Sequence, residues 1–67
     1  MEGEAMTDEE VAAEIQRRGL EVEYLRELAA VLGYAESEGW SAEVVCAIEA
    51  ATYAQRRAAA ERTIRLG

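Results

Sequence analysis

The sequence predicts an all-α protein, a small three-helix bundle with a long C-terminal Ala-rich helix that self-associates. Two observations predict the helices: Pro is absent, and apolar residues recur at spacings of three and four among strong helix formers. A third is that residues 41–66 contain neither Gly nor Pro, as in one uninterrupted helix. Because a chain of 67 residues has room for only a thin core, we expect a second copy or a partner to complete it.

The first helix is expected over residues 8–18. Thr7 and Glu10 have the spacing of a capping box, in which each side chain accepts a hydrogen bond from the other residue's backbone N–H. Gly19 is the predicted stop, because glycine adopts the left-handed conformation that often ends a helix. The apolar stripe of this helix is formed by Val11, Ala12 and Ile15.

The second helix is expected over residues 20–32, closed by Gly33. Its buried face has the spacing i, i+3, i+4 and i+7. That face is formed by Leu25, Leu28, Ala29 and Leu32. The short polar segment 34–40 then suits a turn between antiparallel helices.

The third helix is expected to run from its N-cap, Ser41, to Leu66. One apolar, small-residue stripe along it would let another helix approach closely, so we expect self-association through this face. The stripe consists of Val44, Ala47, Ile48, Ala51, Ala54 and Ala58. Trp40, just before the cap, could either pack against the helix start or contact a partner, and the sequence leaves both open.

Residues 1–6 are expected to form a flexible lead to a single helical domain, residues 7–67. The net charge of −7 argues against unaided binding to nucleic acid or to an anionic membrane. The charge is unevenly placed: residues 1–49 carry thirteen acids and three Arg, and residues 50–67 carry four Arg and one Glu. This asymmetry permits head-to-tail pairing within or between chains.

The composition predicts a cytoplasmic protein. No apolar run approaches the ~20 residues of a membrane span, the first ten residues are acidic, and one Cys cannot form an intramolecular disulfide. All seven basic residues are Arg, and Lys, His, Asn, Pro and Phe are absent, which resembles coding in a GC-rich bacterial or phage genome.

We expect no enzyme and no cofactor. There is no His to ligate a metal with the thirteen Glu, or to activate Cys46 as a nucleophile. Paired glutamates such as Glu23 and Glu27 are expected to lie on helix faces away from the apolar stripes, where no shaped pocket would make one of them a base. We therefore predict no catalytic, cofactor-binding or metal-binding residues.

Residues 25–45 resemble bacterial helix-turn-helix segments in their first half. The matching pattern, L-x-E-L-A-x-x-L-G, is formed by Leu25, Glu27, Leu28, Ala29, Leu32 and Gly33. The second half, which would enter the major groove, contains three Glu and no basic residue. The resemblance therefore implies a helical corner rather than membership of that family.

The sequence favours a small bacterial or phage interaction or regulatory protein that acts by helix–helix contact with itself, as a homodimer, or with a larger protein. One alternative is an acidic nucleic-acid mimic that inhibits a DNA- or RNA-binding enzyme, and a second is a dimeric DNA-binding regulator. The residue types enriched at binding hot spots predict the partner-binding side chains. These are Trp40, Tyr53, Arg56, Arg57, Arg62 and Arg65.

Overall fold

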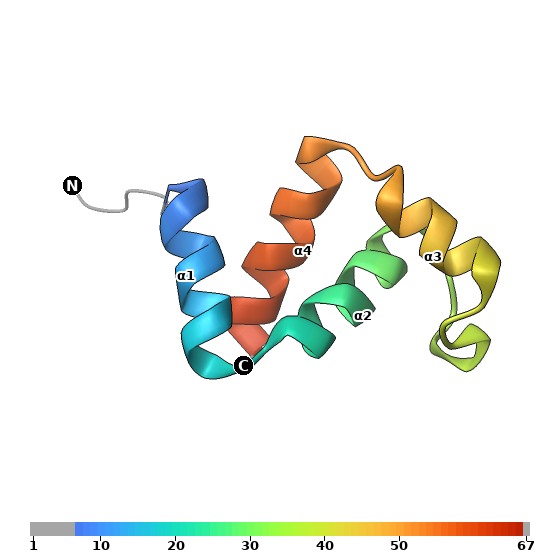
Figure 1. Cartoon of the computed structure of the whole chain (residues 1–67), viewed down its shortest axis with the longest axis horizontal. Helices are drawn as coiled ribbons and strands as arrows, with labels where there is room; N and C mark the ends of the chain where they lie inside the picture. The colour runs from blue at the N-terminus through green and yellow to red at the C-terminus, as the bar shows by residue number, and fades with distance from the viewer. Residues whose placement is uncertain (1–6, 67) are drawn as a thin grey trace.

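The computed structural model describes residues 7–66, and the expected lead 1–6 lies outside them. The described chain contains helices and no strand, so the all-α prediction is confirmed (Figure 1). Its elements are α1 (Asp8–Arg18), α2 (Glu21–Val31), the short 3-10 helix η1 (Glu36–Glu38), α3 (Ala42–Glu49) and α4 (Tyr53–Leu66).

The predicted ends of the first two helices are confirmed to within about one residue. At the start of α1, Thr7 N–H donates to Glu10 Oε1 at 2.9 Å and Glu10 N–H donates to Thr7 Oγ1 at 3.2 Å. Gly19 ends α1 with a left-handed φ of 69°, and its N–H donates to backbone carbonyls of the last turn. These local hydrogen bonds fix where α1 begins and ends.

Helix α4 occupies the middle of the fold. Helix α2 packs most extensively against α4, α1 packs against another part of α4, and α3 packs against α2 (Figure 1). Helices α1 and α2 make few contacts with each other, so they diverge over α4. The helices are therefore joined mainly through α2 and α4.

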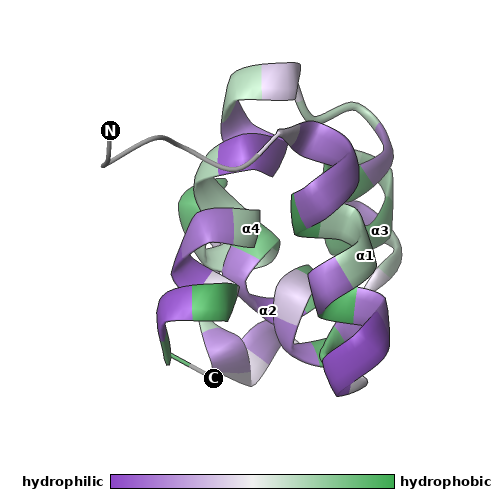
Figure 2. Ribbon diagram, turned by 90° about the vertical axis from the view of Figure 1, so that its left-hand side faces the viewer, coloured by the Kyte–Doolittle hydropathy of each residue, from purple (hydrophilic) through white to green (hydrophobic). Residues whose placement is uncertain are grey.

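The buried side chains are few and mostly small, as the composition predicts. They are Val11, Ile15, Leu28, Val44, Ala59, Ala60 and Thr63. Thr63 satisfies its buried hydroxyl by donating to Ala59 O at 2.8 Å. Figure 2 shows that hydrophilic positions cover most of α1 and that only a few hydrophobic positions interrupt them.

The prediction of one continuous helix over residues 41–66 was wrong. Ser41 is the N-cap as predicted, since its Oγ accepts from Val44 N–H, but α3 ends at Glu49 and a new helix begins at Tyr53. A second capping box starts α4: Thr52 N–H donates to Gln55 Oε1 at 2.9 Å, and Gln55 N–H donates to Thr52 Oγ1 at 3.1 Å. The described chain thus has four α-helices instead of three.

Arg56, in α4, also stabilises the break between α3 and α4. Its Nε donates to Ala51 O at 3.2 Å, and its Nη2 donates to Ile48 O at 3.1 Å and to Glu49 O at 3.2 Å. The last carbonyls of a helix lack intrahelical hydrogen-bond donors, so a guanidinium placed there satisfies them. Its positive charge is also stabilised by the negative end of the helix dipole. Breaking the helix lets α3 pack on α2 while α4 also contacts α1.

None of the helices within residues 7–66 is long and apolar enough to cross a lipid bilayer.

Candidate functional site

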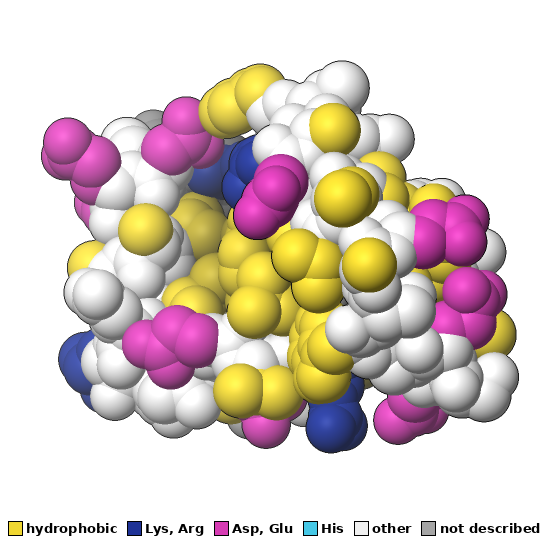
Figure 3. Space-filling view, turned by 45° about the vertical axis from the view of Figure 1, so that its right-hand side comes forward, with side chains coloured by type: hydrophobic (Ala, Val, Ile, Leu, Met, Phe, Trp, Pro, Cys, Tyr) yellow, Lys and Arg dark blue, Asp and Glu magenta, His cyan; other side chains and the backbone are white. Residues whose placement is uncertain are grey.

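An apolar groove lies between α1 and α2, with α4 as its floor, and we call it the α1–α2 groove. It has a volume of about 420 Å³. Its apolar lining comes from all three helices, namely Val11, Ala12, Ile15, Tyr24 and Ala60. Figure 3 shows hydrophobic side chains gathered in this hollow, with acidic side chains on the surrounding surface. The groove forms where α1 and α2 diverge, and it stays open because small residues such as Ala12 and Ala60 do not fill the space between them.

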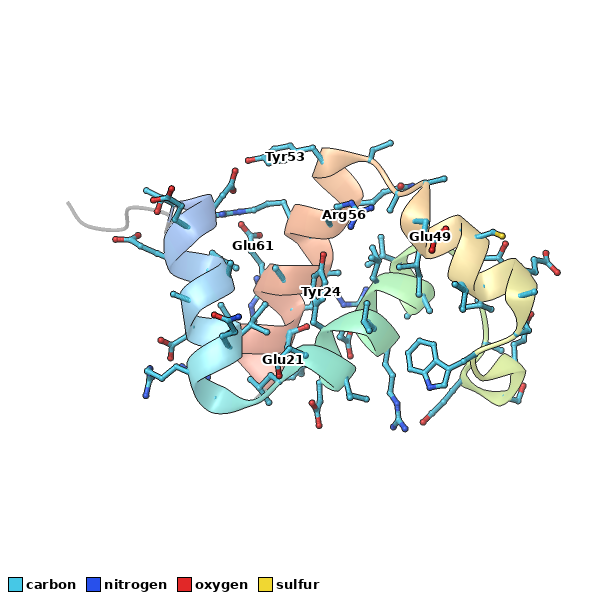
Figure 4. All side chains as sticks on the ribbon, viewed as in Figure 1. Glu21, Tyr24, Glu49, Tyr53, Arg56 and Glu61 are labelled. Carbon is cyan, nitrogen blue, oxygen red and sulfur yellow. The ribbon has the colours of Figure 1, made fainter. Side chains whose placement is uncertain are left out.

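At one end of the α1–α2 groove, where Asp8 and Arg57 line it, a polar cluster ties α1 to α4. Arg57 Nη1 lies 2.9 Å from Asp8 Oδ1, and Arg57 Nε lies 2.9 Å from Glu61 Oε2. Tyr53 reaches from the start of α4, and its hydroxyl donates to Asp8 Oδ1 at 3.0 Å (Figure 4). We call Asp8, Arg57 and Glu61 the Asp8–Arg57–Glu61 cluster.

The carboxylates of the cluster raise the pKa values of Arg57 and of the neighbouring Tyr53. The hydrogen bond to Glu61 is the main cause that raises the pKa of Arg57, with a further contribution from Asp8. The hydrogen bond to Asp8 raises the pKa of Tyr53, because the carboxylate stabilises the protonated phenol. Both side chains therefore keep the protonation states that hold α1 against α4.

The remaining polar lining divides between the two ends of the groove. Arg56 lies at the same end as Tyr53, where its donors are engaged by carbonyls at the end of α3. Glu21 begins α2 at the other end and is exposed, as is Gln16 near the end of α1. Figure 4 shows Tyr24 between these ends.

The predicted anchor Trp40 lies in a second hollow, away from the α1–α2 groove. It is 48% exposed and lies with Tyr34 beside α2 and η1 in a space of about 490 Å³. Burial is the main cause that raises the pKa of Tyr34, and Glu43 adds to it. Several charged side chains also line this hollow, including Glu23, Arg26, Glu27 and Glu36. It is thus a more polar surface than the α1–α2 groove.

The structure separates the four predicted Arg residues. Arg56 and Arg57 line the α1–α2 groove with Tyr53, whereas Arg62 ties α4 to α2, its Nε 3.0 Å from Glu27 Oε1. Arg65 is exposed and makes no ion pair with any other residue in the range 7–66. Most of the C-terminal positive charge therefore holds the chain together.

The six residues of the predicted self-association stripe do not lie on one helix. Val44 is fully buried within the chain, and Ala47 and Ile48 are half-buried on the same helix, α3. Ala51 belongs to the junction, while Ala54 and Ala58 are exposed on α4. The continuous seam expected for a dimer is thus divided by the break at Thr52.

One wall of the α1–α2 groove is formed by Val11, Ala12 and Ile15, which the sequence marks only as the apolar stripe of a helix. Their role as one wall of a groove depends on how far α1 and α2 diverge, which no local pattern encodes. Tyr24, Glu21 and Ala60 had no sequence signal of their own.

The geometry gives little support to a DNA-binding helix or to a metal site. Helix α3, which corresponds to the recognition helix of a helix-turn-helix segment, carries Glu43 and Glu49 and no basic residue. Within residues 7–66, no group of three or more His, Cys, Asp or Glu side chains is placed to hold a metal ion.

No protein-family model, curated protein or solved structure matches this chain. The α1–α2 groove is the more apolar of the two hollows described above. It combines an apolar floor with polar groups at both ends, a combination that is typical of ligand-binding pockets.

Proposed function

We propose that this chain is a small, non-enzymatic interaction protein that binds an amphipathic helix of a partner protein in the α1–α2 groove. The observation that supports the proposal is an open, apolar groove formed by three helices, of which two barely touch each other. A helix laid between α1 and α2 would supply the packing that they lack. Such helix-in-groove binding uses anchors at i, i+3, i+4 and i+7.

The groove suits a helix because its floor and walls present helical ridges with small residues between them. Ala12 is small and exposed on the α1 wall, where it leaves room that a Leu or Ile of the partner could enter. Each such side chain, once buried, contributes about 1.5–3 kcal/mol before the costs of association. A few anchors are therefore enough for measurable binding.

The test is a titration of the isotopically labelled chain with a synthetic helical peptide, followed by nuclear magnetic resonance. The peptide carries Leu at i, i+3, i+4 and i+7 on an Ala background and is ~16 residues long, so that it can form helix. We expect chemical-shift changes to concentrate at Val11, Ile15, Tyr24 and Ala60.

A matched pair of variants gives the control. Ala12→Trp fills the groove, whereas Ala13→Trp adds the same side chain at the neighbouring exposed position of α1, which does not line it. Ala12→Trp should abolish the shift changes and Ala13→Trp should retain them. Shift changes around Trp40 alone, or none at all, would contradict the proposal.

An acidic mimic of nucleic acid remains the second candidate, supported by the net charge of −7 and by carboxylates such as Glu9, Glu23 and Glu49 that form no ion pair within residues 7–66. It predicts binding to basic clefts that weakens steeply with salt and is unaffected by Ala12→Trp.

A further inference from the structure

The second hollow, which we call the Trp40 hollow, combines an accessible aromatic ring with an acidic lining. It has a volume of about 490 Å³, and its aromatic residues are Tyr34 and Trp40. Tyr34 is half-buried, whereas Trp40 is 48% exposed, so much of its side chain is open to a ligand. Among aromatic side chains, the indole of Trp attracts a cation most strongly.

The charged lining of the Trp40 hollow is net negative. It comprises Glu23, Glu27 and Glu36 against one basic residue, Arg26, so its formal charge is −2. Arg62 does not line the hollow but pairs with Glu27 at 3.0 Å, and counting its charge still leaves −1. Glu23 is exposed and forms no ion pair within residues 7–66. A cation can therefore meet Glu23 without breaking an existing pair.

Arg26 does not occupy the remaining acceptor. Its Nη1 lies 3.9 Å from Glu36 Oε2, which is beyond hydrogen-bond distance, and the two side chains are 60% and 86% exposed. An exposed pair with this separation contributes little. The carboxylate of Glu36 therefore keeps its capacity to accept hydrogen bonds from a ligand.

Two further carboxylates lie near Tyr34, although neither lines the hollow. The Tyr34 hydroxyl donates to Glu43 Oε2 at 3.4 Å. Burial is the main cause that raises the pKa of Tyr34, and the charges of Glu43 and Glu38 raise it further. Both glutamates thus add to the negative potential at this wall of the hollow.

We infer that the Trp40 hollow is a second binding surface, which takes an Arg side chain of a partner protein. A guanidinium is planar, so it can stack on Trp40 while its N–H groups donate to Glu23 and Glu36. A quaternary ammonium has no N–H to donate to these carboxylates, and the ammonium of Lys is compact and more strongly hydrated. The hollow shares no lining residue with the α1–α2 groove, so the inference does not depend on helix binding there.

The test uses the fluorescence of Trp40, the only Trp of the chain. The protein is titrated with the capped peptide Gly-Ser-Arg-Ser-Gly, and with matched peptides that carry Lys or citrulline, the neutral analogue of Arg. None of them has an apolar side chain to fill the α1–α2 groove. We expect the Arg peptide to bind in the millimolar range, about 2- to 30-fold more tightly than the citrulline peptide at low salt, with the Lys peptide between them.

Glu23→Gln should weaken binding of the Arg peptide by about 1.5- to 5-fold, because it removes an exposed ion pair. Its matched control is Glu9→Gln, which changes the net charge equally at an exposed position that lines neither hollow, and which should leave the affinity unchanged. Arg26→Gln should strengthen binding, because it removes the one cation of the lining. Circular dichroism checks that all three variants keep the helical content of the parent chain.

Nuclear magnetic resonance of the labelled chain locates the peptide. Shift changes should concentrate at Tyr34 and Trp40, and changes confined to Val11 and Ile15 would overturn the inference, because the peptide would then lie in the α1–α2 groove. Equal affinities for the Arg and citrulline peptides, tighter binding of the Lys peptide, or no binding at all would also overturn it. So would equal weakening in Glu23→Gln and Glu9→Gln, since the effect would then be one of net charge alone, or weaker binding in Arg26→Gln.

Discussion

Thr52→Ala tests the junction between α3 and α4, the helix that forms the floor of the α1–α2 groove. The Thr52 hydroxyl oxygen accepts from Gln55 N–H at 3.1 Å, and this bond is lost in the variant. Replacing an N-cap Thr by Ala costs about 1 kcal/mol, within a range of about 0.5–2 kcal/mol. In a domain of this size, about 1 kcal/mol corresponds to a decrease in Tm of about 4–8 °C.

The same substitution also tests whether the break between α3 and α4 is maintained by tertiary packing or by the local sequence alone. It creates an Ala run from Ala50 through position 52, which favours one continuous helix. Because α4 is held by α1 and α2, and Arg56 still caps α3, we expect the break to persist and the helical content to stay unchanged.

Thermal unfolding followed by far-UV circular dichroism measures both quantities. The control is Ser37→Ala, which removes an exposed hydroxyl that makes no side-chain hydrogen bond within residues 7–66 and should leave Tm within about 2 °C. An unchanged or higher Tm in Thr52→Ala, together with a stronger helical signal, would refute the reasoning.

Three further predictions follow from the core, the surface ion pairs and the thin packing. Leu28→Ala, at a fully buried position, should lower the free energy of unfolding, measured with urea, by about 2–5 kcal/mol. Because domains of this size have about 3–10 kcal/mol of stability, this loss should largely unfold the chain. Val22→Ala, at a 52% exposed position, should lower it by less than about 0.5 kcal/mol. Hydrogen bonds from Arg17 and Arg18 lower the pKa of Glu14, so the stabilisation from these bonds is fully present above the ordinary pKa of 4.5 and is lost as the pH falls through the lowered pKa. Glu14→Gln should therefore reduce the acid-induced decrease in Tm. An identical dependence of Tm on pH in the variant and the parent chain would contradict this prediction. The expected self-association should make Tm and light-scattering mass rise with protein concentration, and a constant monomer mass up to millimolar concentration would exclude it.

The ends of the elements could be predicted where one short pattern determines them. The Thr7–Glu10 capping box, Gly19 and the Ser41 cap are local, since each is set by hydrogen bonds or backbone conformation within four residues. The capping box of Thr52 and Gln55 is just as local, but the Ala residues around it are equally compatible with a continuous helix. Propensity alone therefore favoured the wrong alternative.

The partner-binding residues were predicted by type, and type does not say what a side chain contacts. Tyr53 and Arg57 do lie at the α1–α2 groove, yet Arg57 ties two helices together there. Arg62 likewise pairs with Glu27 across α2 and α4. Whether a basic residue serves the fold or a partner depends on which carboxylates the tertiary structure brings near it.

The sequence by itself determined the all-α class, the capped ends of α1 and the thin, Ala-rich core, because these follow from composition and from contacts a few residues apart. Only the tertiary structure decided that the last stretch divides at Thr52, that α1 and α2 diverge over α4, and that an apolar groove with polar ends results. The physical reason is that these features arise from packing between residues up to 49 positions apart, such as Asp8 and Arg57, where no local periodicity carries information.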